Sequence, residues 1–354
     1  MTGHGAPDVD FTSSLFLGLH HPSDSLPPWE SLTTGVPAVL GTTAAAHRVA
    51  ATVAAARGAQ AGVVGRSAMH ALMDVMGMLP QRRDVVAIDA SAYPLAWWAA
   101  LRAAANGAVV RRYPHHSPDR IAAEPGRRLF VLTDGWCPGC NRPAPLPELH
   151  RLAAATGGAL IVDDSLAYGV LGRRRPGDPF GDGSGTPAWH GLDPAGIIWV
   201  ASLAKAYGAP LALTTGDQLP IRRLAMEGGH RVHSSPPSAA DLAAATMALH
   251  DPAGNRARRS RLRANVLWLR NRLSELELPV NGLPFPVVSI RVPAATASSW
   301  WSHLRSARLH AVLQPSRCRP GVMLTVLVRA DHSDADLDRL TATLRRLARR
   351  QGAA

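Results

Sequence analysis

Residues 159–164 have the sequence Ala-Leu-Ile-Val-Asp-Asp, a short apolar run that ends in two carboxylates. Residues 197–205 follow the same plan, because the run Ile-Ile-Trp-Val-Ala leads into Ser202 and, three residues later, Lys205. Short apolar runs of this kind are typical of strands buried on both faces of a parallel sheet. Ligands of such sheets bind beyond the carboxyl ends of the strands. We therefore expect Asp163 and Lys205 to share one pocket.

The apolar pattern of the first 250 residues alternates between strand-like and helix-like periods, with Gly and Pro between them. Short strands that alternate with helices predict crossover units and a mostly parallel sheet, which is an α/β fold. The expected helices are 44–57, 67–78, 95–106 and 146–156. The expected strands are 85–89, 108–111, 129–133, 159–163, 197–201 and 211–215.

The pattern changes after about residue 250 and predicts a smaller α+β domain. An Arg-rich helix is expected over 253–277, then strands at 286–292 and 322–328 and helices at 297–306 and 333–350. The Gly-, Pro- and Asp-rich stretch 173–187 predicts an irregular loop near the site. We expect three parts: an N-terminal segment (1–40), a large ligand-binding domain (41–250), and a long linking helix with a small C-terminal domain (251–354).

The composition excludes several classes of protein. A chain of 354 residues that is 46% hydrophobic and 18% charged can bury a large core, which excludes a disordered or fibrous protein. No apolar run approaches the roughly 20 residues of a membrane-spanning helix, so no membrane partner is expected. Residues 1–8 lack the basic start and apolar segment of an export signal, so we expect a cytoplasmic protein.

A formal charge of +12 would suit nucleic-acid binding, since clustered basic residues release counterions from phosphates. The arginines are instead spread over most of the chain. Their short clusters at 173–175 and 256–263 have no aromatic residues between them. We therefore expect solvated helix faces and no nucleic-acid partner.

The chain has three cysteines, and two of them form the motif Cys137-Pro-Gly-Cys140. Such a pair can be half of a zinc site, but a structural site needs four ligands. Only Cys318 is left, so a histidine would have to complete the set. Redox chemistry is a second alternative for this motif. We expect an ordinary Pro-Gly turn and no metal site.

The 38 basic residues comprise 37 arginines and a single lysine, Lys205. Arginine is permanently charged, whereas a lysine amine can lose its proton and attack a carbonyl to form an imine. A sole lysine in a chain that otherwise uses arginine is therefore a candidate Schiff-base residue. Chance survival of one lysine is the alternative.

Pyridoxal phosphate (PLP) is a cofactor that needs this set of groups. A lysine binds its aldehyde, a carboxylate keeps its pyridine nitrogen protonated, and hydroxyl and backbone N–H groups hold its phosphate. Lys205, Asp163 and Ser202 match the first three needs. The turn Gly65-Arg66-Ser67 opens an expected helix, whose unpaired N–H groups and dipole favour an anion. The sequence thus predicts PLP, with this turn at the phosphate.

Five segments of the chain resemble, in the same order, motifs of the fold-type I PLP enzymes. Within that class the chain is similar to the α-oxoamine synthases of the class I/II aminotransferase superfamily. This family includes 8-amino-7-oxononanoate synthase and 2-amino-3-ketobutyrate CoA ligase. The segments are Leu15–Pro22, Thr133–Leu149, Val162–Gly172, Ser202–Gly208 and, less closely, His233–Pro237.

The resemblance implies a fold-type I PLP transferase, whose large domain is built on a mostly parallel sheet of the seven-stranded type. It implies that Lys205 binds the cofactor and moves protons, and that Asp163 pairs with the pyridine nitrogen. Ser202 would help to bind the phosphate. The resemblance further implies a homodimer with a shared active site, in which Ser234 or Ser235 reaches the phosphate from the partner subunit.

The chain departs from the family at positions that carry acid-base chemistry. Tyr93 stands where the family stacks a histidine over the cofactor ring. A tyrosine can stack as well, but it is a poorer acid-base group near neutral pH. Leu166 replaces the histidine that binds the ring hydroxyl, and Leu132 replaces a serine. Tyr168, two residues after Leu166, is a candidate to compensate for that histidine.

Two further departures concern arginines. Thr325 aligns with the arginine that grips the substrate carboxylate, a bidentate clamp that is hard to replace. Three alternatives follow: another arginine takes this role, the substrate lacks the carboxylate, or the substrate presents it elsewhere. Leu213 stands where aspartate-aminotransferase-like enzymes place a phosphate-binding arginine, which favours the oxoamine-synthase branch. The candidate replacement arginines are Arg317, Arg319 and Arg329.

We expect a PLP-dependent transferase that acts on an amino acid or amine through an external aldimine. The favoured reaction is carbon-carbon condensation with an acyl thioester in a specialised biosynthetic pathway. Transamination, or another replacement at Cα or on the side chain, is the alternative. A catalytically degenerate binding protein is a third hypothesis, which the retention of the only lysine disfavours. The sequence names neither the amino donor nor the thioester.

Overall fold

The chain forms two compact units in the computed structural model. The structure describes residues 7–24, 26, 28–33, 35–174, 176–178, 180–278 and 280–352. The larger unit holds residues 19–137 and 143–252, and the smaller unit holds the residues up to 18, 138–142 and those from 253 onward.

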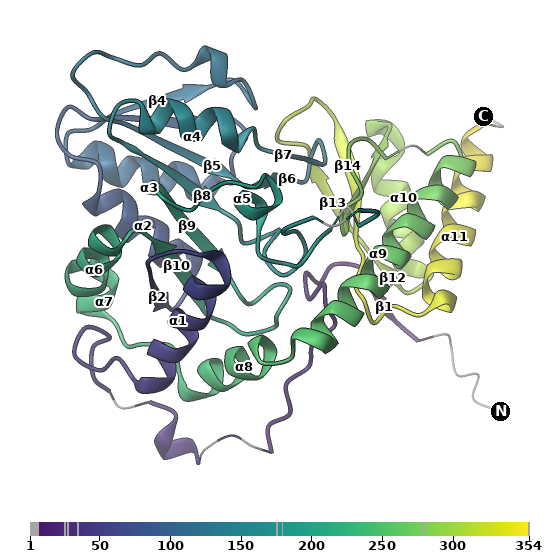
Figure 1. The fold of residues 1–354 in the computed structure, drawn as a ribbon. Coiled ribbons are helices and arrows are strands. Elements are labelled where there is room, and N and C mark those ends of the chain that lie inside the picture. Colours follow the sequence, from purple (N-terminus) through teal and green to yellow (C-terminus); the bar gives the residue numbers. More distant parts are fainter. Residues whose placement is uncertain are drawn as a thin grey trace. The chain divides into compact units, whose positions relative to one another are not determined.

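A seven-stranded sheet forms the centre of the larger unit (Figure 1). Its strand order is β2-β10-β9-β8-β5-β3-β4. Neighbouring strands are parallel except at β10, which runs antiparallel to both β2 and β9. The strands are β2 (Ala61–Gly65), β3 (Val85–Asp89), β4 (Val109–Tyr113), β5 (Leu129–Asp134), β8 (Ala159–Asp163), β9 (Ile197–Ser202) and β10 (Ala212–Gly216).

Helices cover both faces of this sheet. The helices α2 (Ala68–Met78) and α3 (Pro94–Ala105) share a core with Ile198 and Val200 of β9. Trp199, between those two residues, faces the opposite side, where Arg57 of α1 (Ala44–Arg57) lies over its ring. The helix α4 (Leu146–Ala154) packs against β5 and β8. Because both faces are covered, the strands are apolar on both sides rather than alternating.

Shorter elements complete the larger unit. Strands β6 (Trp136–Cys137) and β7 (Arg142–Pro143) form a two-stranded hairpin between β5 and α4 in the sequence, and residues 138–142 of this hairpin belong to the smaller unit. The helix α8 (Ala239–Leu249) packs against α1 and begins with a capping box formed by Ser238 and Asp241. The other elements are η1 (Trp29–Ser31), η2 (Pro118–Arg120), α5 (Thr186–Trp189), α6 (Gln218–Glu227) and α7 (Gly229–His233).

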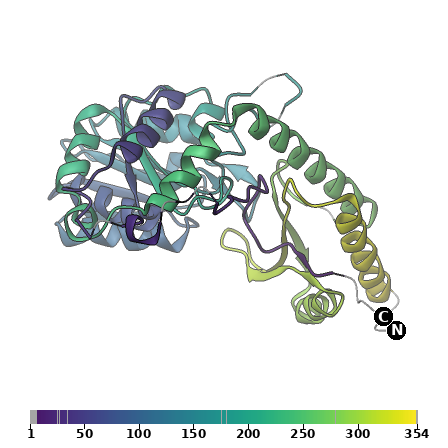
Figure 2. The ribbon, with the colours of Figure 1, turned by 90° about the horizontal axis from the view of Figure 1, so that it is seen from below.

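The smaller unit contains a three-stranded antiparallel sheet of order β11-β14-β13. A separate parallel pair joins β1 to β12. The helix α9 (Pro252–Glu275) is one continuous helix of 24 residues (Figure 2). The other elements are β1 (Val9–Asp10), β11 (Val287–Val292), α10 (Ala294–Ser306), β12 (Leu309–His310), β13 (Val312–Pro315), β14 (Val322–Leu327) and α11 (Asp334–Gly352).

The predicted α/β class with a mostly parallel sheet of seven strands is confirmed. Strand β2 is missing from the expected set, because Ala-Gly-Val-Val-Gly is short and holds two glycines. Gly62 lies against α1, where a Cβ atom would come within 2.8 Å of the Ala50 carbonyl oxygen. None of the helices in the described residues combines the length and the apolar composition that a membrane span requires.

The core between α2 and the sheet should dominate the stability of the larger unit. Leu72 of α2 is fully buried there, so Leu72→Ala should lower the free energy of unfolding by about 2–5 kcal/mol. The control Met69→Ala, on the exposed side of the same helix, should change it by less than about 0.5 kcal/mol. Urea unfolding followed by circular dichroism measures both. Equal effects of the two substitutions would contradict the assigned packing.

Candidate active site

The register of the sheet places several polar residues at one edge. Asp163 at the end of β8 is the direct partner of Asp134 on β5 and of Val200 on β9. Two residues further along β9, Ser202 is the partner of Ala212, which in turn is the partner of Gly65 at the end of β2. Because β10 runs antiparallel, its first residue lies at the edge where the other strands end. This edge therefore assembles residues from four parts of the sequence.

Asp163 and the end of β9 are linked by hydrogen bonds. Asp163 is half-buried, and its Oδ1 accepts a hydrogen bond of 3.0 Å from the backbone N–H of Ser165. The Ser165 hydroxyl oxygen accepts one of 3.0 Å from the backbone N–H of Ser202. The turn after β8 and the end of β9 are thereby held in one position relative to each other.

Lys205 lies in the turn that follows β9, and its side chain is half-buried. The Ser202 hydroxyl accepts a hydrogen bond of 3.2 Å from the backbone N–H of Ala204, which shapes this turn. Gly208, just beyond it, has a φ of +64°, a conformation that glycine adopts without strain. The structure thus places Lys205 and Asp163 after neighbouring strands of the same edge, as the sequence predicts.

The predicted phosphate turn lies at the same edge. Gly65 ends β2, and apart from its chain neighbours no atom of the described residues lies within 4 Å of the position that a Cβ would take there. Ser67 caps α2 by accepting a hydrogen bond of 3.3 Å from the backbone N–H of His70, while the Arg66 side chain is exposed. Gly65 and Arg66 line a pocket together with Ser235. The glycine turn and this serine therefore lie in the wall of one cavity.

Ser234 and Ser235 both line this pocket within one chain. The Ser234 hydroxyl donates a hydrogen bond of 2.5 Å to the His230 carbonyl oxygen, so its proton is already used. Ser235 is therefore the better candidate of the two for an anion. Its contribution from a partner subunit stays a prediction.

Tyr93 caps the N-terminus of α3 just after β3. Its backbone N–H donates a hydrogen bond of 2.8 Å to Asp134 Oδ2, and Asp134 is the strand partner of Asp163. The Tyr93 side chain is 54% exposed, unlike the core around it. An exposed ring held at this edge suits stacking on a planar ligand.

A histidine pair in the wall of the pocket does not follow from the sequence analysis. His230 Nδ1 lies 2.7 Å from Oδ1 of the buried Asp74, and the rings of His230 and His70 are 4.3 Å apart. Burial, aided by the neighbouring His230, lowers the pKa of His70. The i, i+4 spacing of His70 and Asp74 on α2 is the only local signal, because His230 comes from a distant helix.

The buried carboxylate of Asp164 fixes the turn that follows β8. Asp164 accepts hydrogen bonds from Trp199 Nε1 at 2.8 Å and from the Thr186 backbone N–H and hydroxyl at 2.8 and 2.7 Å. Burial raises the pKa of Asp164 despite these bonds and the charge of Arg57. Burial likewise lowers the pKa of Arg57 to about 10. Arg57 also donates to the Ser184 carbonyl oxygen, so the network joins α1, β9 and the loop before α5.

Leu132, Leu213 and Tyr168, which lie at or near positions where the chain departs from the family, are buried in the core of the larger unit. Leu132 and Leu213 are fully buried in the sheet. Tyr168 is buried against Trp199 and Tyr207, so its ring is part of the core. The suggestion that Tyr168 replaces the missing histidine at the cofactor is therefore not supported.

Thr325, which aligns with the carboxylate-binding arginine of the family, lies in the smaller unit. Thr325 is fully buried in β14, where its hydroxyl lies 3.0 Å from that of Ser289. Arg329, one candidate replacement, forms ion pairs with Asp331 at 2.9 Å and Asp10 at 3.6 Å. These pairs occupy its guanidinium, so Arg329 is a poor candidate for that role.

The residues of the larger unit fit PLP. A half-buried carboxylate and a half-buried lysine follow neighbouring strands, and an exposed aromatic ring stands at the same edge. The phosphate would meet an open glycine, the N-terminus of an eleven-residue helix and Ser235. Each group that the cofactor needs has a donor or acceptor of the right kind.

Comparisons with known proteins agree with this geometry. No protein-family model matches the chain. It is 35% identical over 251 residues to the 8-amino-7-oxononanoate synthase of Halorhodospira halophila, a match that covers 69% of this chain and 60% of that enzyme. It is 28% identical over 356 residues to a putative 8-amino-7-oxononanoate synthase of Thermosynechococcus vestitus, which covers 96% of this chain and 88% of the relative. The first match thus spans less than two thirds of its relative.

Solved structures share the fold at low sequence identity. A serine palmitoyltransferase from S. paucimobilis, with a bound PLP-myriocin aldimine, matches with a TM-score of 0.86 and 16% identity over 98% of this chain and 89% of that chain. The 8-amino-7-oxononanoate synthase of Francisella tularensis matches with a TM-score of 0.75 and 18% identity over 98% of both chains. The predicted fold type and the predicted resemblance to α-oxoamine synthases are confirmed.

The buried network gives a stability prediction. Asp164→Ala should lower the free energy of unfolding by about 3–5 kcal/mol, because Arg57 keeps its buried charge and loses the carboxylate. The control Glu227→Ala removes an exposed pair with Arg223 and should cost less than about 1 kcal/mol. Thermal and urea unfolding measure both variants. A cost for Asp164→Ala as small as that of the control would show that the network does not stabilise the fold.

Proposed function

We propose that this chain, a divergent relative of the α-oxoamine synthases, is a PLP-dependent transferase that joins an amino donor to the acyl group of a thioester. The observation that carries the proposal is the position of Lys205, the only lysine, one strand away from Asp163 at the same edge of the sheet. A cofactor bound there would have its aldehyde at the lysine and its pyridine nitrogen at the carboxylate.

Each residue of the edge has a defined task in this proposal. Asp163 would hold the proton on the pyridine nitrogen. The hydrogen bond that its carboxylate accepts from the backbone N–H of Ser165 keeps the carboxylate in place. The glycine turn at Gly65 and the N-terminus of α2 bind the phosphate dianion through backbone N–H groups and the helix dipole. Tyr93 covers one face of the cofactor ring. Ser202 shapes the lysine turn and lies one strand from Gly65 through Ala212.

Bound PLP supplies an electron sink that stabilises negative charge on the carbon next to the substrate amine. Lys205 is the residue of this edge that can take and return a proton at that carbon, because a neutral amine is a base and arginine is not. Tyr93 is a poor proton carrier near neutral pH, so Lys205 would carry the proton transfers that a histidine shares in the family.

Condensation is favoured over transamination by two observations. The relatives with matching sequence are named 8-amino-7-oxononanoate synthases, and a structural neighbour is a serine palmitoyltransferase. Leu213, in the core of β10, leaves no arginine at the position that aspartate-aminotransferase-like enzymes use for the phosphate. Transamination or another replacement at Cα remains the second hypothesis. The homodimer and the cytoplasmic location stay predictions.

Reduction with borohydride tests the cofactor and the lysine together. The full chain loaded with PLP and then reduced should carry one phosphopyridoxyl group, and peptide mass spectrometry should find it on Lys205. Lys205→Ala should abolish both the covalent label and the visible absorption of the bound cofactor while it keeps the far-ultraviolet spectrum of a folded protein. A folded wild-type chain without label would leave the fold standing and remove PLP catalysis. It would favour the binding-protein hypothesis.

The reaction type is tested by supplying amino donors with and without acyl-CoA. For condensation, free CoA thiol should be released only when donor and acyl-CoA are both present, and Asp163→Asn should reduce the rate strongly because the carboxylate no longer holds the ring proton. Thiol detection and mass spectrometry of the product measure this. Conversion of the cofactor to its pyridoxamine form by the donor alone would instead support transamination.

A further inference from the structure

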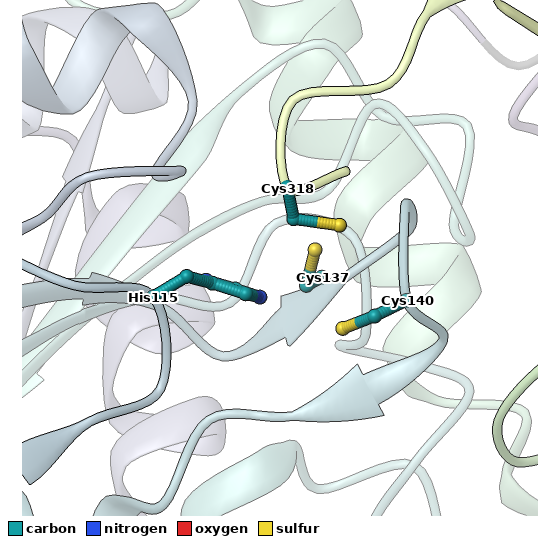
Figure 3. Close-up of side chains that lie close together, drawn as sticks. All are labelled: His115, Cys137, Cys140 and Cys318. Carbon is teal, nitrogen blue, oxygen red and sulfur yellow. The ribbon is translucent and has the colours of Figure 1, made fainter. Parts of the chain in front are cut away.

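Two pairs of titratable side chains in the larger unit have no task in the reaction described above. In the first pair, His115 and Cys137 lie close together, with their ligand atoms within 4.8 Å of each other (Figure 3). In the second pair, the ring centroids of His70 and His230 are 4.3 Å apart. The second pair lines the same pocket as the glycine turn at Gly65. It is therefore the pair that can act on an anion bound at that turn.

Asp74 holds His230 in one orientation. The Asp74 side chain is buried on α2, and its Oδ1 lies 2.7 Å from Nδ1 of His230 on α7. The backbone N–H of His230 donates to the same carboxylate, at 3.1 Å from Oδ1 and 3.3 Å from Oδ2. An ionised carboxylate only accepts hydrogen bonds, so in the neutral ring Nδ1 carries the proton and Nε2 has a lone pair. Nε2 of His230 is therefore an atom that can take up a proton.

His70 lies in the first turn of α2, where Ser67 positions its ring. Its Nδ1 lies 3.2 Å from the Ser67 hydroxyl oxygen, which also accepts a hydrogen bond of 3.3 Å from the backbone N–H of His70. Burial lowers the pKa of His70, and the neighbouring charges of His230 and Arg66 act in the same direction. Asp74 opposes them. An anion in the pocket would act as Asp74 does and favour the protonated ring.

The charged residues that line the pocket leave an excess of positive charge. Besides the two histidines, they are Arg66, Arg231 and Asp74. The Arg231 guanidinium donates four hydrogen bonds of 2.8–3.2 Å to uncharged acceptors, which are the carbonyl oxygens of Ala38, Val64 and Ala225 and the hydroxyl of Thr42. These four bonds do not cancel its charge. With neutral histidines, the described wall of the pocket carries one net positive charge, which favours an anion.

The histidine pair can hold one added proton. Two imidazolium rings at this distance repel each other, so protonation of one ring disfavours protonation of the other. The two arginines disfavour the added proton, whereas Asp74 favours it. A phosphate dianion in the pocket would therefore shift the pair toward a single imidazolium. The lining residues from β2, β10 and α6 have no titratable side chain; they are Val63, Val64, Gly65, Thr214 and Leu224.

We propose that His70 and His230 take up one proton when the cofactor phosphate binds, and that the resulting imidazolium supplies a charge that Leu213 cannot supply. This inference rests on the proposed function, because the phosphate is that of PLP. An arginine keeps its charge at every physiological pH, whereas a histidine pair loses its charge as the pH rises. The complex binds more protons than the free chain, so the affinity for the phosphate falls as the pH rises.

Binding of pyridoxine 5'-phosphate to the cofactor-free full chain tests the proposal. This probe has the phosphate but no aldehyde, so it forms no imine with Lys205. Calorimetry at pH 7.5, in two buffers with different ionisation enthalpies, should show the uptake of up to one proton. The dissociation constant should rise between pH 7 and pH 9, by at most about tenfold per pH unit. The phosphate remains a dianion in this range, because its second pKa is about 6.

Matched variants assign the proton to the pair. The double variant His70→Gln/His230→Gln should lose the proton uptake and bind the probe at pH 7 about as weakly as the wild-type chain does at pH 9. His250→Gln, which changes an exposed histidine at the end of α8, should behave as the wild type does. The ring nitrogen of the probe is the same in all variants, so the difference between variants reports the histidines.

The same proton uptake in the wild type and in the double variant would overturn the inference. If the double variant does not fold, His70→Gln keeps the contact between Asp74 and His230 and should reduce the uptake; an unchanged uptake would again overturn it. A wild-type chain that carries the borohydride label on Lys205 but binds the probe without proton uptake refutes the inference and leaves the proposed function standing. A chain that neither takes the label nor binds the probe refutes both.

Discussion

The site depends on one constraint, which is that parallel strands all end at the same edge of their sheet. Asp163, Ser202 and Gly65 are far apart in sequence, yet the pairing of β8, β9, β10 and β2 brings them to that edge. Any slip of register by one residue would turn the side chains at the strand ends to the opposite face. Coverage of both faces by helices makes such a slip costly, because it would exchange two packed apolar surfaces.

The buried carboxylate of Asp164 is the second element of this arrangement. Asp163 and Asp164 are neighbours with opposite tasks, since the first faces the edge and the second faces the core. Asp164 is surrounded by Trp199, Thr186 and the charge of Arg57, so that the turn after β8 is bonded to β9 and to the start of α5. A buried charge of this kind costs desolvation energy, and the network of bonds offsets that cost. The benefit is a rigid position for the carboxylate next to it.

The departures from the family follow a consistent pattern. Positions that carry histidine, serine or arginine in α-oxoamine synthases carry Tyr93, Leu132, Leu166 and Thr325 in this chain, and Leu132 and Thr325 are packed in sheets. In the proposed reaction, the proton transfers would therefore be carried by Lys205. Position 325 offers no arginine for a substrate carboxylate, and Arg329 is paired with Asp10 and Asp331. A donor with a different anionic group, or with none, would fit these changes.

The sequence by itself determined the strand ends and identified Lys205 as the candidate Schiff-base residue. Apolar runs that stop at a carboxylate or hydroxyl are local signals, and a single lysine among 37 arginines is visible from composition. Several helices and strands begin and end where periodicity places them, as in α1, β3 and β8. The sequence pattern did not predict the glycine-rich strand β2. Its glycines allow close packing against α1, and the position of that helix on the sheet cannot be derived from periodicity.

Only the tertiary structure decided which distant groups meet. His230 reaches Asp74, Arg57 reaches the face of Trp199, and His115 reaches Cys137 across β3, β4 and β6. Such contacts depend on strand order and on the face that each helix covers, and neither is encoded in the spacing of residues along the chain. Local patterns specify where a strand ends, but the neighbour of that end is chosen by the packing of the whole sheet.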